Sequence, residues 1–101
     1  MVNVGILGTG TLAVALGRAW TAAGHEVLVT GRNPERAAKA AAGSGGEAVK
    51  PGELAGRVDV VVVAIAWDGL ADALSLLGPL DGRVVVDCSN AVDYATKNQK
   101  A

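Results

Sequence analysis

Residues 2–13, VNVGILGTGTLA, decide the fold of this chain. The stretch 2–7 is mostly apolar and β-branched, which is typical of a strand buried on both faces. Glycines at positions 8 and 10 then interrupt the strand. From residue 11 to residue 23 the pattern is helical, and the predicted apolar face holds Leu12, Leu16, Ala19 and Trp20, with Arg18 opposite. The sequence therefore predicts a strand, a tight turn and a helix.

Strands and helices continue to alternate along the chain. Gly24 stands where a helix C-cap glycine belongs, and residues 26–30 form the second predicted strand. Asn33 and Pro34 predict the start of a second helix, which ends near residue 42 before the glycine-rich stretch 43–46. The remaining predicted elements are an edge strand at 47–49, a helical turn at 51–55, a central strand at 59–66, a helix at 68–77 capped by Asp68, and a last strand at 83–87.

This order of elements predicts an α/β fold with a doubly wound parallel sheet. Alternating strands and helices require right-handed crossovers, which place helices on both faces of the sheet. The expected order of the five strands is 3-2-1-4-5, as in Rossmann-type folds. Residues 1–92 form the predicted domain, and residues 93–101 form a polar C-terminal tail.

Composition limits the remaining possibilities. A chain of 101 residues is long enough for one domain, and 19 Ala and 15 Val against no Phe predict a core of small and β-branched side chains. A hydrophobic content of 50% with 19% charged residues excludes a disordered chain. A net charge of −1 indicates no basic stripe for nucleic acid. The longest apolar run, residues 60–67, is 8 residues long and too short to cross a bilayer.

The counts of cysteine and histidine exclude two further kinds of site. One cysteine forms no disulfide within the chain, and one cysteine with one histidine supplies no structural zinc site. The first residues read as a strand without a basic leader, so we expect a cytoplasmic protein.

The glycine turn carries the clearest functional signal. Residues 8–13 form a G-x-G-x-x-A motif between a predicted strand and a predicted helix. In dinucleotide-binding folds Gly8 would permit the turn, Gly10 would let a pyrophosphate approach the backbone, and Ala13 would let helix and strand pack closely. Backbone N–H groups as far as Leu12 and the hydroxyls of Thr9 and Thr11 are expected to bind the pyrophosphate. The alternative is a structural glycine turn in another α/β fold.

The end of the second strand indicates which dinucleotide binds. NAD-specific folds carry an acidic residue there for the ribose 2′-hydroxyl, whereas this chain has Thr30-Gly31-Arg32-Asn33. The Arg32 guanidinium suits a 2′-phosphate, with Arg36 one turn later. Thr30 and Asn33 are further candidate donors. We therefore predict NADP(H); the alternative is that the two arginines are ordinary solvated residues at a helix start.

Three stretches carry a resemblance to a known family. Residues 5–37, 59–74 (DVVVVAIAWDGLADAL) and 82–90 (GRVVVDCSN) together resemble the NADP-binding domain of NADPH:coenzyme F-420 oxidoreductases. That domain is shared in outline with pyrroline-5-carboxylate reductases and 6-phosphogluconate-type dehydrogenases. The resemblance implies hydride transfer between NADPH and a deazaflavin. It also implies that a hydroxyl residue and an arginine, matched here by Thr30 and Arg32, bind the 2′-phosphate.

Two positions depart from the family pattern. Ala66 stands where the family often has a proline, and Ala91 follows Asn90 where a proline is also frequent. Both prolines shape loops around the nicotinamide in the family. Its members also carry a further segment that completes the acceptor site, so the resemblance implies cofactor binding more strongly than turnover.

The ends of the last two strands are expected beside the nicotinamide. Asn90 either bonds the carboxamide or ribose, or caps its own turn. Trp67 either covers the nicotinamide ring or packs under a loop, and Cys88 is expected to be a small buried side chain. We assign no catalytic side chain, because hydride transfer needs orientation and exclusion of water rather than a protein nucleophile.

The predicted site and its possible functions follow from these motifs. The predicted cofactor-binding residues are Gly8, Thr9, Gly10, Thr11, Leu12, Thr30, Gly31, Arg32, Asn33, Arg36, Ala64, Ile65, Ala66, Trp67 and Asn90. Three functions stay open: an oxidoreductase with coenzyme F-420 as acceptor, a non-catalytic NADP(H)-binding module or truncated fragment, and a reductase of small imines or ketones. An apolar surface expected beyond the last strand favours a homodimer.

Overall fold

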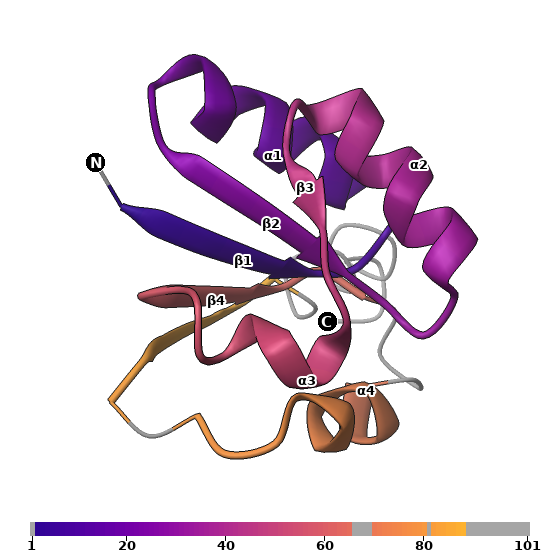
Figure 1. Cartoon of the computed structure of the whole chain (residues 1–101), viewed down its shortest axis with the longest axis vertical. Helices are drawn as coiled ribbons and strands as arrows, with labels where there is room; N and C mark the ends of the chain where they lie inside the picture. Colours follow the sequence, from indigo (N-terminus) through magenta and orange to yellow (C-terminus); the bar gives the residue numbers. More distant parts are fainter. Residues whose placement is uncertain (1, 66–69, 81, 89–101) are drawn as a thin grey trace, which may run out of the picture.

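A five-stranded parallel sheet forms the centre of the molecule (Figure 1). The computed structural model of the chain describes residues 2–65, 70–80 and 82–88. The elements are β1 (Asn3–Leu7), α1 (Thr11–Ala22), β2 (Glu26–Thr30), α2 (Pro34–Ser44), β3 (Glu47–Ala48), α3 (Pro51–Leu54), β4 (Val60–Val63), α4 (Leu70–Leu77) and β5 (Val84–Asp87). The strand order is β3-β2-β1-β4-β5, which confirms the predicted α/β Rossmann-type fold.

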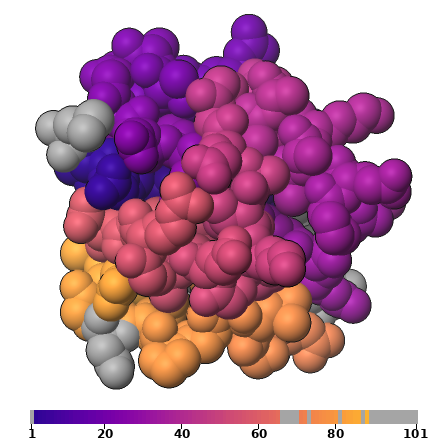
Figure 2. Space-filling view, in the orientation of Figure 1, coloured from indigo at the N-terminus to yellow at the C-terminus, as the bar shows by residue number. Residues whose placement is uncertain are grey.

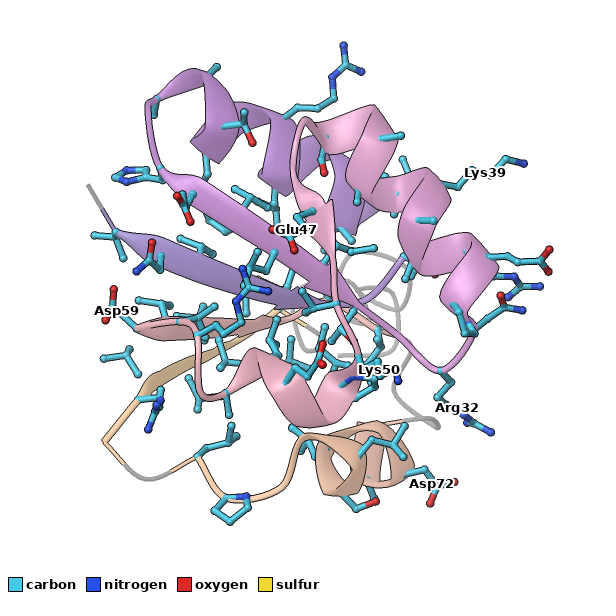
Figure 3. All side chains as sticks on the ribbon, in the orientation of Figure 1. Arg32, Lys39, Glu47, Lys50, Asp59 and Asp72 are labelled. Atoms are coloured by element: carbon cyan, nitrogen blue, oxygen red, sulfur yellow. The ribbon has the colours of Figure 1, made fainter. Side chains whose placement is uncertain are left out.

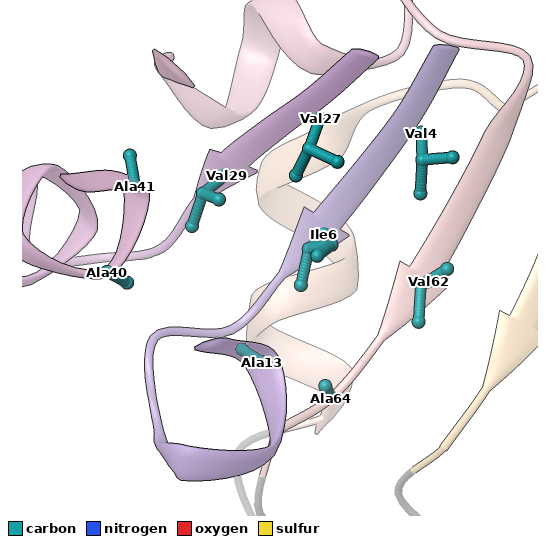
Figure 4. Close-up of a cluster of buried hydrophobic side chains, with 9 residues drawn as sticks. All are labelled: Val4, Ile6, Ala13, Val27, Val29, Ala40, Ala41, Val62 and Ala64. Atoms are coloured by element: carbon teal, nitrogen blue, oxygen red, sulfur yellow. The ribbon is translucent and has the colours of Figure 1, made fainter. Parts of the chain in front are cut away.

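Two separate clusters of buried side chains hold helices to the two faces of the sheet. On one face Val4, Ile6 and Val29 pack with Ala13 of α1 and Ala40 of α2 (Figure 4). On the other face the cluster contains Leu7, Leu28, Leu54 of α3, Val58, Val61, Val63 and Leu77 of α4. Side chains of successive strand residues alternate between the faces, so every strand near the centre must be apolar throughout. The predicted core of small and β-branched residues is confirmed for the first cluster.

The register of the strands aligns their carboxyl ends. Leu7, the last residue of β1, lies beside Thr30 on one side and Val63 on the other. The N–H of Gly8 donates to the Thr30 carbonyl oxygen at 2.9 Å, and the N–H of Ala64 donates to the Leu7 carbonyl oxygen at 2.9 Å. The loops that follow β1, β2 and β4 therefore emerge together at one edge of the sheet, which is where ligands bind in such folds.

Two helix predictions need correction. Ala19 is exposed, and the buried residues of α1 are Ala13 and Gly17, flanked by partly buried Leu12, Leu16 and Trp20. α2 continues to Ser44 rather than stopping near residue 42, because Gly43 and Ser44 keep helical geometry and Gly45 adopts the left-handed conformation at φ +79°. At the end of α1 the C-cap is Ala23, and Gly24 follows it with φ +95°.

The central strand is shorter than predicted. The sequence predicts a strand over 59–66, whereas β4 pairs from Val60 to Val63. Its neighbours β1 and β5 end at Leu7 and Asp87, which pair with Val63, so the ladder stops before Ala64 and Ile65, and residue 66 lies outside the described residues. The predicted N-cap of α4, Asp68, lies outside the described residues.

α1 and α2 approach each other unusually closely at Gly17. A Cβ atom placed on Gly17 would lie 2.5 Å from the Cβ of buried Ser44 and 3.4 Å from the Ile6 side chain. Only a glycine leaves room for this contact. The two helices therefore pack backbone against side chain, with both helix N-termini at the carboxyl edge of the sheet.

Candidate functional site

The turn after β1 requires glycine at its first position. Gly8 has φ +148°, and a Cβ atom there would overlap the carbonyl oxygen of Ala64. The Gly8 N–H is already engaged by the Thr30 carbonyl. Three strand ends thus meet around Gly8, which confirms the predicted tight turn and leaves no space for a side chain.

The start of α1 presents donors to open space. Gly10 is the N-cap, with φ −87° and no side-chain hydrogen bond to the first turn. The first intrahelical bond runs from the Val14 N–H to the Gly10 carbonyl at 3.1 Å, so the N–H groups of Thr11, Leu12 and Ala13 lack helical acceptors. A Cβ atom on Gly10 would meet nothing within 4 Å. This arrangement fits a phosphate group at the positive end of the helix dipole.

A shallow cavity of about 460 Å³ runs along this end of α1. Its lining includes the predicted residues Thr9, Gly10 and Thr11, together with Val14, Ala15 and Arg18. Arg18 was not among the predicted site residues. Its signal was present in the sequence, because Arg18 lies seven positions after Thr11 and therefore shares its helix face.

The loop after β2 lies against the glycine turn. A Cβ atom on Gly31 would lie 2.9 Å from the Thr9 methyl group, so the two loops touch. Arg32 is exposed, whereas Thr30 is fully buried and its hydroxyl has no hydrogen-bond partner in the described part of the chain. In this structure, Arg32 rather than Thr30 is therefore the side chain that a phosphate in solution can reach.

Asn33, in the same loop, caps the start of α2. Its Oδ1 accepts from the N–H groups of Glu35 at 2.9 Å and Arg36 at 3.1 Å, which confirms the predicted N-cap of α2. The amide nitrogen of Asn33 keeps two donor hydrogens beyond this cap. Arg36 is exposed on the first turn of the helix.

A larger pocket of about 650 Å³ opens beside Arg32, and sequence reasoning missed most of it. Its walls come from the β2–α2 loop, α2, the end of β3, α3 and α4, and its lining residues are Gly31, Arg32, Pro34, Ala37, Ala48, Val49, Lys50, Pro51, Glu53 and Leu76. Figure 2 shows the α2, α3 and α4 segments meeting on one face of the molecule. Figure 3 shows Arg32 and Lys50 on this side, where β2 and β3 end.

Only some of the residues predicted to lie beside the nicotinamide are among the described residues. Ala64 is buried and Ile65 is half-buried at the end of β4. Cys88 is partly buried against the first core cluster, and its N–H donates to the Val63 carbonyl at 2.7 Å. Ala66, Trp67 and Asn90 lie outside the described residues, so their predicted contacts stay predictions.

Residues 2–65, 70–80 and 82–88 contain neither a candidate metal cluster nor a candidate membrane span. Within these ranges no group of three or more His, Cys, Asp or Glu side chains is placed to hold a metal ion. None of the helices in these ranges is long and apolar enough to span a membrane.

Comparison with known proteins agrees with this geometry. Residues 3–91 match the family model described as NADP oxidoreductase, coenzyme F420-dependent. An imine reductase from Pseudomonas sp. is 27% identical, with a TM-score of 0.72 over 98% of this chain and 37% of that chain. No curated protein matches in sequence.

Two further solved structures show the fold alone. An imine reductase from Myxococcus stipitatus, a V8 variant in complex with NAD+, is 19% identical, with a TM-score of 0.73 over 98% of this chain and 36% of that chain. A 1-pyrroline-5-carboxylate reductase from Streptococcus pyogenes is 22% identical, with a TM-score of 0.64 over 85% of this chain and 33% of that chain. The chain thus spans 33% to 37% of the length of these three structures.

The family match includes the glycine turn, all five strands and the loop after β2. The donors at the start of α1 and the open space at Gly10 fit the phosphates of a dinucleotide. The chain therefore belongs to the coenzyme F420-dependent NADP oxidoreductase family, and it is a nicotinamide-dinucleotide-binding oxidoreductase domain.

Proposed function

We propose that the domain binds NADP(H) in preference to NAD(H). The observation that carries this proposal is the loop after β2, where an exposed arginine stands in place of the acidic residue of NAD-specific folds. Arg32 lines the pocket beside the loop, and the first turn of α2 adds Arg36. A carboxylate at this position would repel a 2′-phosphate, whereas a guanidinium forms charge-assisted hydrogen bonds with it.

The reaction we propose is hydride transfer between NADPH and a deazaflavin, coenzyme F-420. The bound nicotinamide supplies the hydride, and the protein orients the cofactor and excludes water. The N–H groups at the start of α1 would hold the pyrophosphate, and the predicted residues Ala64, Ile65, Ala66, Trp67 and Asn90 would lie toward the nicotinamide. The family description supports this acceptor.

Two alternatives have support of their own. The Pseudomonas relative is an imine reductase, which favours a small imine as acceptor. Imine reduction also needs a proton for the product nitrogen. Residues 64–67, directly after β4, include no acid or lysine for this task, and the sequence assigns the next acid, Asp68, to a helix cap. The second alternative is a binding module without turnover, since the donors at the start of α1 serve cofactor binding and need no catalytic side chain.

We further propose a cytoplasmic homodimer that forms through β5. Val84, Val85 and Val86 are 61%, 45% and 44% exposed, and β5 is the last strand in the sheet order. An exposed apolar edge strand readily pairs with another strand.

Two measurements test the proposed function. Calorimetric titration with NADPH and NADH should show tighter binding of NADPH, and a stopped-flow assay with oxidised coenzyme F-420 should then show NADPH consumption. Equal affinities would contradict the NADP(H) preference. Tight NADPH binding with turnover of an imine, and none of the deazaflavin, would favour the alternative acceptor.

A further inference from the structure

We propose that Lys50 is a second determinant of cofactor preference, whose ammonium group binds the 2′-phosphate of NADP(H) together with Arg32. This inference rests on the proposed function and extends it to a residue outside both sequence motifs. It concerns the 650 Å³ pocket between α2, α3 and α4 rather than the glycine turn.

The short strand β3 brings Lys50 beside the end of β2. Leu28 pairs with Glu47 and Val29 with Ala48, and the Val49 N–H donates to the Val29 carbonyl at 2.9 Å. Lys50 follows Val49 directly and is the N-cap of α3, and it lines the same pocket as Gly31 and Arg32. Lys50 and Arg32 therefore leave neighbouring segments at the same edge of the sheet, and both line the pocket.

The shape and lining of the pocket suit the adenosine end of a dinucleotide. Its volume falls within the range of about 300–1,000 Å³ that small-molecule sites occupy. Six of its lining residues are apolar: Pro34, Ala37, Ala48, Val49, Pro51 and Leu76. Such walls suit a flat purine ring. They also give a reason for Leu76, which is 44% exposed on the surface of α4.

The charges around the pocket favour a strongly negative ligand. Arg32 and Lys50 are exposed and take part in no ion pair within the described part of the chain, where the ion pair present joins Arg57 to Glu47 at 3.3 Å. The one carboxylate in the lining, Glu53, accepts the backbone N–H of Lys50 at 3.3 Å. Arg32 and Lys50 line the same pocket, where two positive charges repel each other. A phosphate dianion bound between them would be attracted to both.

The two cations would recognise the phosphate in different ways. Arg32 offers a planar pair of donors, whereas Lys50 acts as a mobile point charge. Because NAD(H) carries a hydroxyl in place of the 2′-phosphate, the contribution of Lys50 would appear with NADP(H) alone.

The test uses two fragments of the cofactor that differ only in the 2′-phosphate, adenosine 2′,5′-bisphosphate (2′,5′-ADP) and 5′-AMP. Calorimetric affinities are measured for the wild-type chain and for Lys50→Met, Lys50→Arg and Lys39→Met. Lys39 is an exposed lysine of α2 that is not part of the pocket and points into solvent in Figure 3. It serves as the control for loss of one positive charge.

We expect Lys50→Met to weaken the binding of 2′,5′-ADP about tenfold, while the binding of 5′-AMP stays unchanged. Lys50→Arg should retain most of the affinity, and Lys39→Met should change neither ligand. The salt dependence of 2′,5′-ADP binding should also decrease in Lys50→Met. Circular dichroism verifies that each variant is folded.

Three outcomes would overturn the proposal, and they are distinguishable. If the wild type prefers 2′,5′-ADP and Lys50→Met keeps the full preference, the role of Lys50 is wrong but the proposed function stands. If Lys50→Met weakens the binding of both fragments equally, Lys50 shapes the pocket and does not bind the 2′-phosphate. If the wild type binds both fragments equally, the NADP(H) preference is itself wrong.

Discussion

Gly10 is a residue at which the fold and the ligand make different demands. Its φ is −87° and a Cβ atom would enter open space, so the backbone tolerates a side chain. The same space is the one that a pyrophosphate needs. We therefore expect Gly10→Val to abolish NADPH binding while lowering stability by about 1 kcal/mol or less, the cost of a poorer N-cap.

Gly56 provides the control for this substitution. It is exposed, it lies in the turn after α3, and a Cβ atom there would also meet nothing within 4 Å. Gly56→Val should bind NADPH as the wild type does. Fluorescence titration with NADPH measures both variants. Wild-type affinity in a folded Gly10→Val protein would contradict the phosphate site.

Arg32 allows the cofactor preference to be measured at a single side chain. A charge-assisted hydrogen bond to phosphate is worth about 1.5–3 kcal/mol, and exposure of Arg32 favours the lower value. Arg32→Ala should weaken NADPH binding about tenfold and leave NADH unchanged.

The matched control removes an arginine elsewhere. Arg57 forms an exposed ion pair with Glu47, and such pairs contribute little to stability. Arg57→Ala should change neither affinity. If Arg32→Ala weakened both cofactors equally, Arg32 would contact a group that NAD(H) and NADP(H) share.

Sequence alone predicted the residues of contiguous motifs better than those brought together by folding. The glycine turn and the Asn33 cap follow from short-range geometry, so the sequence pattern was sufficient for them. Lys50 enters the site through the pairing of β2 with a two-residue strand. The sequence predicted an edge strand at 47–49 and its place beside the second strand, but not the register that brings Lys50 to the pocket, because register depends on the partner strand.

At the scale of elements, the contact between α1 and α2 can be tested by a mutant cycle. A Cβ atom on Gly17 would lie 2.5 Å from that of Ser44, so Gly17→Ala should destabilise the fold by about 1–3 kcal/mol through overpacking. Ser44→Gly removes the Cβ atom that would clash with an alanine at position 17. Alone, this substitution should lower the free energy of unfolding by about 1 kcal/mol, because glycine disfavours the helix. The double variant should recover part of the loss caused by Gly17→Ala.

Urea denaturation of the four proteins measures the free energy of unfolding and hence the coupling. Additive losses in the double variant would show that the helices adjust independently.

Sequence patterns predicted both helices but not the end of α2. Gly43 is typical of a helix end, yet in the structure it remains within α2, which ends at Ser44.

At the scale of the whole molecule, β5 should govern association. Its three valines are exposed, and a positive charge at their centre would disfavour strand pairing. We expect sedimentation velocity to show a concentration-dependent dimer for the wild type and a monomer for Val85→Lys. Both should bind NADPH, because the glycine turn lies at a different strand.

Reduction of the acceptor should depend on association of two copies of the chain. The described domain offers one wall of a cleft, and hydride transfer requires a second wall that holds the acceptor and excludes water. We expect the Val85→Lys monomer to reduce coenzyme F-420 far more slowly than the wild type at concentrations where the latter is dimeric. Rapid reduction by a strictly monomeric chain would show that one wall is enough.

The close approach of Gly17 to Ser44 has a consequence for cofactor engineering. It holds the middle of α1 against the last residue of α2, at the opposite end of α2 from the loop that we propose sets cofactor preference. The packing of the helix pair is thus independent of the exposed arginines Arg32 and Arg36. We expect that these two positions can be exchanged for those of an NAD-specific enzyme without repacking the helices, provided that buried Thr30 and the Asn33 cap are kept.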